Sequence, residues 1–313
     1  MRNTRASRKF EMNLKPLSIT ATDTAKEPLK KPQRPPKIAV VIGSGGLKTV
    51  GCVELFHFLD QNNIPIDLIV GCSGGSIFTV MRVLGYSTDR MKELFCDYVN
   101  KRVFESIDYL GAIRLIWNIN YRTFPSLLKG NAFKESLDEL FGDTLLENLP
   151  IKTVIQATDF DTGEEICIEK GNASDAIYAS STVVPLLPMI ELNGRKLIDG
   201  GYTNSLPITT ALNRDADIII AMGFSEKVEQ TKSIFEATVD FISMVSRENR
   251  SWKTLVELDY QHYHEIIIVD VAYEQAIPWS DPDNIDLIFK KSKKAVEQAA
   301  HQIVSAVETW YKK

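Results

Sequence analysis

Short continuous apolar segments alternate along this chain with longer segments in which apolar residues recur at helical spacing. The most apolar short segments are residues 37–42, 68–70, 151–158, 217–222 and 265–270. Their β-branched residues and the turn residues around them predict buried strands. Because strands and helices alternate, the strands are expected to run parallel and to be joined by helical crossovers. The pattern predicts an α/β fold with a mostly parallel central sheet.

Several longer segments show the apolar spacing of three and four residues that is typical of amphipathic helices. They are residues 53–59, 77–81, 87–128, 133–141, 175–181, 234–245 and 289–310. Residues 103–128 are rich in large apolar side chains, which favours core-packed helices; a lid or an acyl-chain pocket is the second interpretation. A hairpin is expected between residues 151–158 and 165–169, and a short strand at 196–198.

The composition is that of an ordinary globular protein. The chain has 313 residues, of which 44% are hydrophobic and 25% charged, enough for one large domain or two modest ones. No apolar run approaches the roughly 18 residues that span a bilayer. The net charge of −5 gives no reason to expect a nucleic-acid partner.

Positive charge is concentrated at the N-terminus. Residues 1–36 hold nine Lys and Arg against three Asp and Glu, with few apolar residues and several prolines. They are predicted to form a disordered basic leader and linker, with residues 37–313 as the folded domain. A transit peptide and a tail that contacts anionic lipid are the alternatives. The leader lacks the apolar core of a secretory signal, so a cytoplasmic location is expected, with peripheral contact to a membrane left open.

The four cysteines, Cys52, Cys72, Cys96 and Cys167, show neither metal-ligand nor CxxC spacing. They are expected to be reduced thiols in the core of a protein from a reducing compartment. We expect no metal and no other cofactor.

The strand at residues 68–70 runs directly into a sharp turn with Ser73 at its apex. Gly71 and Gly75 stand two positions to either side, which gives the G-x-S-x-G pattern, and Gly74 follows the serine. A serine on so tight a strand-to-helix turn needs neighbours without side chains, and its hydroxyl is pushed out above the sheet. The helix N-terminus there also favours negative charge. The pattern indicates a nucleophile, although a glycine-rich turn can also bind a phosphate.

Two more glycine-rich loops follow expected strands. The first contains Gly43, Ser44, Gly45 and Gly46, and the second contains Asp199, Gly200 and Gly201. Because the carboxyl ends of parallel strands meet at one edge of a sheet, all three loops are expected to lie together there. The bare backbone N–H groups of the first loop could form an oxyanion hole. A dinucleotide loop or P-loop is excluded, because Lys48 stands where the former needs glycine and Leu47 separates Gly46 from Lys48.

A serine nucleophile needs a base, and the chain holds four histidines. His57 and His301 lie in predicted helices. His262 and His264 precede a late strand, in a position suited to a hydrolase histidine. Asp199 is better placed, because it ends a strand and two glycines follow it. Alone it would be interpreted as a turn aspartate that accepts backbone N–H groups; beside the two other loops it is predicted to belong to a Ser–Asp dyad.

The order of these motifs resembles the patatin-like phospholipase family. The similarity runs from about residue 38 to residue 207 and includes Thr158 with Asp159, Ala179 with Ser180, Pro185, Pro188, Asn204 and Pro207. The resemblance implies a three-layer α/β/α fold and hydrolysis of acyl esters in phospholipids or other lipids, without a catalytic histidine. It implies that Ser73 is the nucleophile and Asp199 the base. It further implies that Gly45 and Gly46 are the oxyanion donors.

The first loop departs from the pattern of the family. Lys48 replaces an arginine, Thr49 replaces a glycine, and Ser44 interrupts the glycine run. Lysine keeps a positive charge but loses the planar fork that binds phosphate, which bears on headgroup preference more than on catalysis. The motifs end near residue 207, so residues 208–313 are the less diagnostic part of the domain.

Three functions are compatible with these motifs. The first is a serine lipid acyl hydrolase, with a lipid ester as its substrate. The second is a histidine-dependent α/β-hydrolase that uses His262 or His264. The third is a non-catalytic lipid-binding protein of the same fold, an alternative that the altered Lys48 and Thr49 support.

Overall fold

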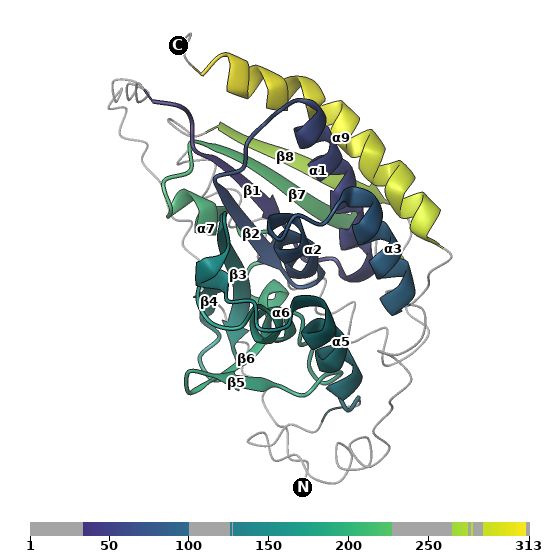
Figure 1. The fold of residues 1–313 in the computed structure, drawn as a ribbon, viewed down its shortest axis with the longest axis vertical. Coiled ribbons are helices and arrows are strands. Elements are labelled where there is room, and N and C mark those ends of the chain that lie inside the picture. The colour runs from purple at the N-terminus through teal and green to yellow at the C-terminus, as the bar shows by residue number, and fades with distance from the viewer. Residues whose placement is uncertain are drawn as a thin grey trace, which may run out of the picture.

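The structure is a computed structural model that describes residues 34–99, 126, 128–226, 265–274, 277 and 284–310 (Figure 1). Several expectations fall outside these residues. They are the leader up to residue 33, most of the apolar segment 103–128, the helix at 234–245, and the histidines His262 and His264.

Eight strands form one sheet within the described residues. They are β1 (Ile38–Ile42), β2 (Leu68–Cys72), β3 (Lys152–Asp159), β4 (Glu165–Ile168), β5 (Ile190–Leu192), β6 (Arg195–Asp199), β7 (Ile218–Glu226) and β8 (Glu265–Tyr273). Their order is β5-β6-β3-β2-β1-β7-β8, and β4 pairs with β3. Neighbouring strands in the series β3-β2-β1-β7-β8 are parallel. In contrast, β4 and β6 pair antiparallel with β3, and β5 pairs antiparallel with β6. The predicted mostly parallel sheet and the hairpin of β3 and β4 are confirmed.

The described helices follow most of the predicted ones, with ends shifted by a few residues. They are α1 (Cys52–Gln61), α2 (Gly74–Val83), α3 (Thr88–Val99), α5 (Asn131–Phe141), α6 (Ala173–Ser180), α7 (Ile208–Leu212) and α9 (Ile285–Glu308), together with the short 3-10 helices η1 (Gly46–Gly51), η3 (Leu146–Asn148) and η4 (Gly200–Tyr202). The sequence did not predict α7 or β5, which are only five and three residues long.

Alternate residues of the central strands face two hydrophobic cores, one on each side of the sheet. Val40 and Ile42 of β1 face the larger core, which α1, α2 and α9 cover. Ala39 and Val41 face the smaller core, which α7 covers. All five residues of β1 are therefore buried, as expected for a parallel strand with helices on both faces. The predicted α/β architecture is confirmed, and Figure 1 shows α1, α2, α3 and α9 in front of the sheet.

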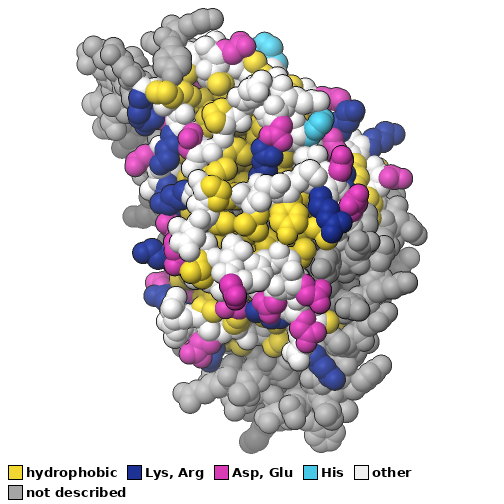
Figure 2. Space-filling model, in the orientation of Figure 1, with side chains coloured by type: hydrophobic (Ala, Val, Ile, Leu, Met, Phe, Trp, Pro, Cys, Tyr) yellow, Lys and Arg dark blue, Asp and Glu magenta, His cyan; other side chains and the backbone are white. Residues whose placement is uncertain are grey.

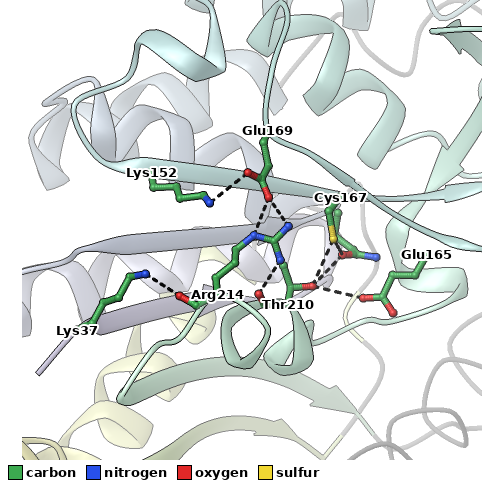
Figure 3. A network of polar contacts seen from close by, with 8 residues as sticks. Lys37, Lys152, Glu165, Cys167, Glu169, Thr210 and Arg214 are labelled. Atoms are coloured by element: carbon green, nitrogen blue, oxygen red, sulfur yellow. Dashed lines mark hydrogen bonds and ion pairs between the residues drawn. The ribbon is translucent and has the colours of Figure 1, made fainter. Parts of the chain in front are cut away.

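A polar network ties α7 to the hairpin of β3 and β4 (Figure 3). Arg214, which follows α7, donates to Glu169 next to β4, and Lys152 at the start of β3 pairs with the same carboxylate at 3.3 Å. On α7 itself, Thr210 Oγ1 donates to Glu165 Oε1 at 3.4 Å. These contacts hold the segment that follows β6 against the sheet.

Charged side chains of both signs are interspersed over the face that carries α1, α2 and α9, with hydrophobic side chains gathered between them (Figure 2). An even mixture of signs is typical of an ordinary solvated surface. Among the described helices, none combines the length and the apolar character needed to cross a bilayer.

One expectation about the cysteines is wrong. Cys52 and Cys72 are buried free thiols, as predicted, but Cys167 is exposed. Among the described strands, β4 pairs only with β3 and is mostly half-buried, so Cys167 keeps an exposed side although its Sγ lies 3.7 Å from Thr210 Oγ1. Burial raises the pKa of the Cys52 thiol, which keeps that thiol protonated and unreactive.

Candidate active site

Ser73 lies at the sharp turn between β2 and α2. Its φ of 53° and ψ of −132° are a strained combination for a residue with a side chain. A Cβ at Gly71 would lie 2.6 Å from the Cα of Ser76, and one at Gly75 would lie 2.6 Å from the Gly43 carbonyl oxygen. The turn therefore closes only with glycine on both sides of Ser73, which gives the physical reason for the G-x-S-x-G pattern.

The hydroxyl of Ser73 and the carboxylate of Asp199 are in direct contact. Ser73 Oγ donates to Asp199 Oδ2 at 2.6 Å, although the two residues are 126 positions apart. The Gly201 N–H donates to Asp199 Oδ1 at 2.7 Å. Ser73 is 7% exposed and Asp199 5%. A hydroxyl bonded to an ionised carboxylate at this distance makes a charge-assisted hydrogen bond.

Burial raises the pKa of Asp199 from 3.8 to about 6, and the hydrogen bonds from Ser73 and Gly201 oppose part of that rise. Asp199 is therefore mostly ionised at neutral pH but is a stronger base than a solvated aspartate. Burial, and after it the charge of Asp199, raise the pKa of the neighbouring Tyr202. Its hydroxyl donates to the Val184 carbonyl at 2.8 Å, so Tyr202 stays neutral beside the carboxylate.

The backbone of Asp199 is held on both sides. Its N–H donates to the Thr182 carbonyl at 2.9 Å, and its carbonyl accepts from Thr158 Oγ1 at 2.9 Å. Thr158 Oγ1 also lies 3.0 Å from Thr203 Oγ1. These bonds fix the direction of the carboxylate independently of Ser73.

The strand that carries Asp199 runs opposite to the expected direction. β6 follows β5 in a hairpin and pairs antiparallel with β3. Asp199 pairs with Ala157, and Cys72 pairs with Gln156 on the same side of β3, because β4 pairs with both Gln156 and Ala157 on the other side. Asp199 at the end of the antiparallel β6 therefore meets Ser73 just beyond the end of β2. The expectation that all three glycine-rich loops follow parallel strands is wrong for this loop, because the long β3 gives β6 a place to pair beside the site.

The loop after β1 packs against the two other glycine-rich segments. A Cβ at Gly74 would lie 2.6 Å from the Gly46 carbonyl oxygen, and one at Gly201 would lie 2.9 Å from Ser44 Oγ. A Cβ at Gly200 would lie 2.4 Å from the carbonyl oxygen of a residue in β3. The structure therefore brings together the three segments that the sequence singled out.

The first loop presents two backbone donors. The N–H groups of Gly45 and Gly46 have no acceptor within the described part of the chain. Thr49 Oγ1 donates to the Gly46 carbonyl at 2.7 Å, and the Lys48 N–H donates to the Gly45 carbonyl at 3.2 Å. Thr49, which departs from the family pattern, thus braces the loop at the start of η1. Free N–H groups at such a bend can bind a developing negative charge.

Neither described histidine takes part in the site. His57 on α1 and His301 on α9 are exposed, and the hydrogen bonds of the Ser73 hydroxyl and the Asp199 carboxylate go elsewhere. Within the described ranges, no cluster of three His, Cys, Asp or Glu residues could hold a metal ion.

Sequence reasoning missed the roles of Ser180 and Thr158. Ser180 Oγ accepts the Ser73 N–H at 2.8 Å, and Thr158 holds the Asp199 carbonyl. Both belong to the motifs that carry the family resemblance, yet neither was given a role. The sequence offered only the general signal of a hydroxyl in a buried element, because a buried hydroxyl must find a partner, and it did not indicate which partner.

Ser73 at a strained strand-to-helix turn, with a carboxylate as its partner, has the geometry of a serine-hydrolase site in an α/β fold. The family model described as patatin-like phospholipase matches residues 40–212. Because this match covers more than half of the chain, the chain belongs to the patatin-like phospholipase family.

Curated relatives include lysophospholipase NTE1 of Saccharomyces cerevisiae, which is 28% identical over 197 residues, 62% of this chain and 11% of that protein. Lysophospholipase NTE1 of Candida glabrata is 29% identical over 198 residues, again 62% of this chain and 11% of the relative. The chain thus matches about a tenth of the length of these relatives. The crystal structure of VipD from Legionella pneumophila shares the fold, with a TM-score of 0.52 and 11% identity over 86% of this chain and 67% of that one.

Proposed function

We propose that this chain hydrolyses acyl ester bonds of lipids, with Ser73 as nucleophile and Asp199 as base. The observation that carries the proposal is the 2.6 Å hydrogen bond from Ser73 Oγ to the buried Asp199 carboxylate at a strained turn. Membership of the patatin-like phospholipase family supports the same activity. Catalysis by such a pair needs no histidine, provided that the carboxylate is basic enough.

In the proposed mechanism, Asp199 accepts the Ser73 proton while Ser73 Oγ attacks the ester carbonyl. The N–H groups of Gly45 and Gly46 bind the resulting oxyanion. Asp199 returns the proton to the alcohol as it leaves, which gives an acyl-enzyme on Ser73. Asp199 then accepts a proton from water as the water attacks the acyl group, and that proton returns to Ser73 as the fatty acid is released.

The raised pKa of Asp199 supports its role as the base. With a pKa of about 6, Asp199 is ionised in most molecules at neutral pH and still accepts a proton more readily than a solvated aspartate. Its proton affinity therefore comes from its buried position at the end of β6.

For the substrate, we propose a phospholipid or lysophospholipid, because the relatives of this chain are named lysophospholipases. Lys48 lies next to the donor loop, where the family pattern has arginine. Lysine keeps the positive charge of the arginine but lacks the planar guanidinium that binds a phosphate with two parallel hydrogen bonds. We expect acid release from a panel of lipid esters to depend less on the phosphate than it would with arginine, and Lys48→Arg to increase that dependence.

The direct test is covalent labelling by a fluorophosphonate probe, together with fatty-acid release from the lipid panel. Wild type should be labelled on Ser73 and should release fatty acid, whereas Ser73→Ala should do neither. Ser174→Ala is the matched control, because this buried serine bonds to Asp138 and Lys134 rather than to the site. Labelling that survives Ser73→Ala would overturn the proposal.

Two variants separate the dyad from a histidine mechanism. Asp199→Asn should abolish ester turnover, whereas the double change His262→Ala and His264→Ala should leave it. The opposite result would assign the base to a histidine. Binding of lipid without acid release from any ester would instead identify a non-catalytic protein.

A further inference from the structure

Ser180, the last residue of α6, joins the turn at Ser73 to β3. Its hydroxyl accepts the Ser73 N–H at 2.8 Å and donates to the Gln156 carbonyl at 2.5 Å. The side chain is fully buried. One hydroxyl thus satisfies a donor and an acceptor that come from two different strand segments.

Ser180 differs in this respect from other hydroxyls in or directly after helices. Ser136 Oγ donates to the Ala132 carbonyl, and Thr182 Oγ1 donates to the Tyr178 carbonyl, each four residues back. This is the usual local bond of serine and threonine in helices. The hydroxyl of Ser180 points instead to partners outside α6, so its orientation serves the tertiary structure.

The acceptor of Ser180 lies next to the residues that hold the base. Gln156 precedes Ala157, which pairs with Asp199 across β3 and β6. The residue after Ala157, Thr158, donates to the Asp199 carbonyl. Three consecutive residues of β3 therefore hold both members of the dyad. The first holds the nucleophile through Ser180, the second is the strand partner of the base, and the third holds the base by a hydrogen bond.

We propose that Ser180 is a positioning residue that fixes the strained backbone of Ser73 relative to β3 and thereby sets the contact between Ser73 Oγ and Asp199. The inference rests on the proposed function, because Ser180 itself touches no reacting atom. It also restricts the oxyanion site. Since Ser180 occupies the Ser73 N–H, this amide does not bind the oxyanion, which agrees with the proposed role of the N–H groups of Gly45 and Gly46.

Removing this hydroxyl has a defined consequence. Without it, the Ser73 N–H and the Gln156 carbonyl are buried with no partner, and the turn has lost the bond that opposes its relaxation. A shift of about 1 Å between reacting groups can lower a rate by about 100-fold. Because the Ser180 side chain is fully buried, we expect the loss to fall on the rate constant of the chemical step rather than on substrate binding.

The test is the kinetics of fluorophosphonate labelling of the full chain, with kinact and KI measured separately. Ser180→Ala should lower kinact by about 10- to 100-fold and change KI by less than about twofold. Ser174→Ala is the matched control, because Ser174 is equally buried on the same helix but bonds to Asp138 and Lys134. It should lower Tm without lowering kinact.

The outcomes are distinguishable. If wild type is not labelled on Ser73, the proposed function fails and the inference fails with it. If wild type is labelled but Ser180→Ala reacts at the wild-type rate, or Ser174→Ala loses as much, only the inference is overturned. If Ser180→Ala does not fold, hydrogen exchange on wild type decides. A Ser73 amide that exchanges far more slowly than those of Gly45 and Gly46 supports the inference, and one that exchanges as fast overturns it.

Discussion

At the scale of single residues, Asp199 meets two opposed requirements. Its carboxylate must be ionised to accept a proton from Ser73, yet it is almost fully buried. Three hydrogen-bonding groups around it, on Ser73, Gly201 and Thr158, hold its carboxylate and its carbonyl in place. The burial that makes it a useful base also opposes its ionised state.

The first prediction concerns the pH dependence of acylation. Because the pKa of Asp199 is raised to about 6 and the ionised form is the base, kinact for the fluorophosphonate probe should be half-maximal near pH 6. It should fall about tenfold per pH unit well below that value and be level above about pH 7.5. A midpoint near pH 4 would show that Asp199 is not desolvated. Parallel measurements of Tm should exclude acid unfolding as the cause.

The second prediction concerns stability. The pKa of Asp199 is higher in the folded chain than the ordinary 3.8, so the folded state binds its proton more tightly than the unfolded state does. Burial of Asp199 therefore costs little stability at low pH, where the carboxyl is protonated in both states. The free energy of unfolding falls as the pH rises from about 4 to about 6. Above that range the cost is on the order of 3 kcal/mol.

Asp199→Asn removes this cost while keeping the shape of the side chain. The variant should unfold at a higher temperature than wild type, and the gain should be larger at pH 8 than at pH 5. Thermal unfolding at the two pH values measures it. An equal gain at both pH values would contradict the assigned pKa. The variant should also be inactive, which would separate stability from function at this residue.

At the scale of elements, α9 supports the helix that begins with the donor loop. Gly51, the last residue of η1, lies so close to Ser292 on α9 that a Cβ there would be 1.9 Å from Ser292 Oγ and 2.9 Å from Ser292 Cβ. Ser292 is fully buried and its hydroxyl has no hydrogen-bond partner in the described chain. The close approach of η1 and α9 at this point explains why Gly51 and Ser292 are both small residues.

The third prediction follows from this contact. Gly51 has a helical φ of −60°, so alanine there is opposed by sterics alone. Gly51→Ala should lower the free energy of unfolding by about 1–3 kcal/mol, and Ser292→Gly in the same chain should restore most of it. Ser305→Gly, on the same helix, should restore nothing. Denaturant unfolding of wild type, Gly51→Ala, Ser292→Gly and the double variant gives the coupling energy between the two positions. Additive effects of Gly51→Ala and Ser292→Gly would contradict the contact.

Predictability from the sequence also differs between elements. The turn at Ser73 was predictable, because its glycines obey a local steric rule. The direction of β6 was predictable only from Asn193 and Gly194, whose φ values of 52° and 74° make the tight turn between β5 and β6. Asn-Gly is a strong hairpin signal, and it indicates an antiparallel β6. The role of Ser180 was not predictable, because its partners are distant in sequence and only the packing of α6 brings them together.

At the scale of the whole molecule, the two ends of the described body are joined. Arg34 donates to Asp217 Oδ2 at 2.6 Å, and Trp310 Nε1 donates to the Arg34 carbonyl at 3.0 Å. The Lys37 N–H also donates to Asp217 Oδ2, at 2.7 Å. The Asp217 side chain is 2% exposed and that of Arg34 is 48% exposed. The residues at the end of the expected leader thus contact both the start of β7 and the end of α9.

The fourth prediction is that Arg34→Ala lowers the free energy of unfolding by about 1–3 kcal/mol. Loss of the guanidinium leaves a buried carboxylate with fewer donors, but the half-exposure of Arg34 keeps the cost below that of a fully buried pair. Arg90→Ala is the matched control, because Arg90 pairs with Glu93 and both are exposed; it should change stability by less than about 0.5 kcal/mol. Equal effects of the two changes would show that the pair at Asp217 is only a surface contact.

The contact between Arg34 and Trp310 has a topological consequence. These residues meet near the amino ends of β1 and β7, whereas Ser73 lies at the carboxyl end of β2. Joining them by a short linker would turn the described body into a nearly closed loop of chain, which could be opened elsewhere. The exposed turn at Gly85, where a Cβ would meet nothing within 4 Å, is a suitable point. Such a circular permutant would keep the strand order and leave Ser73 remote from both its old and its new termini.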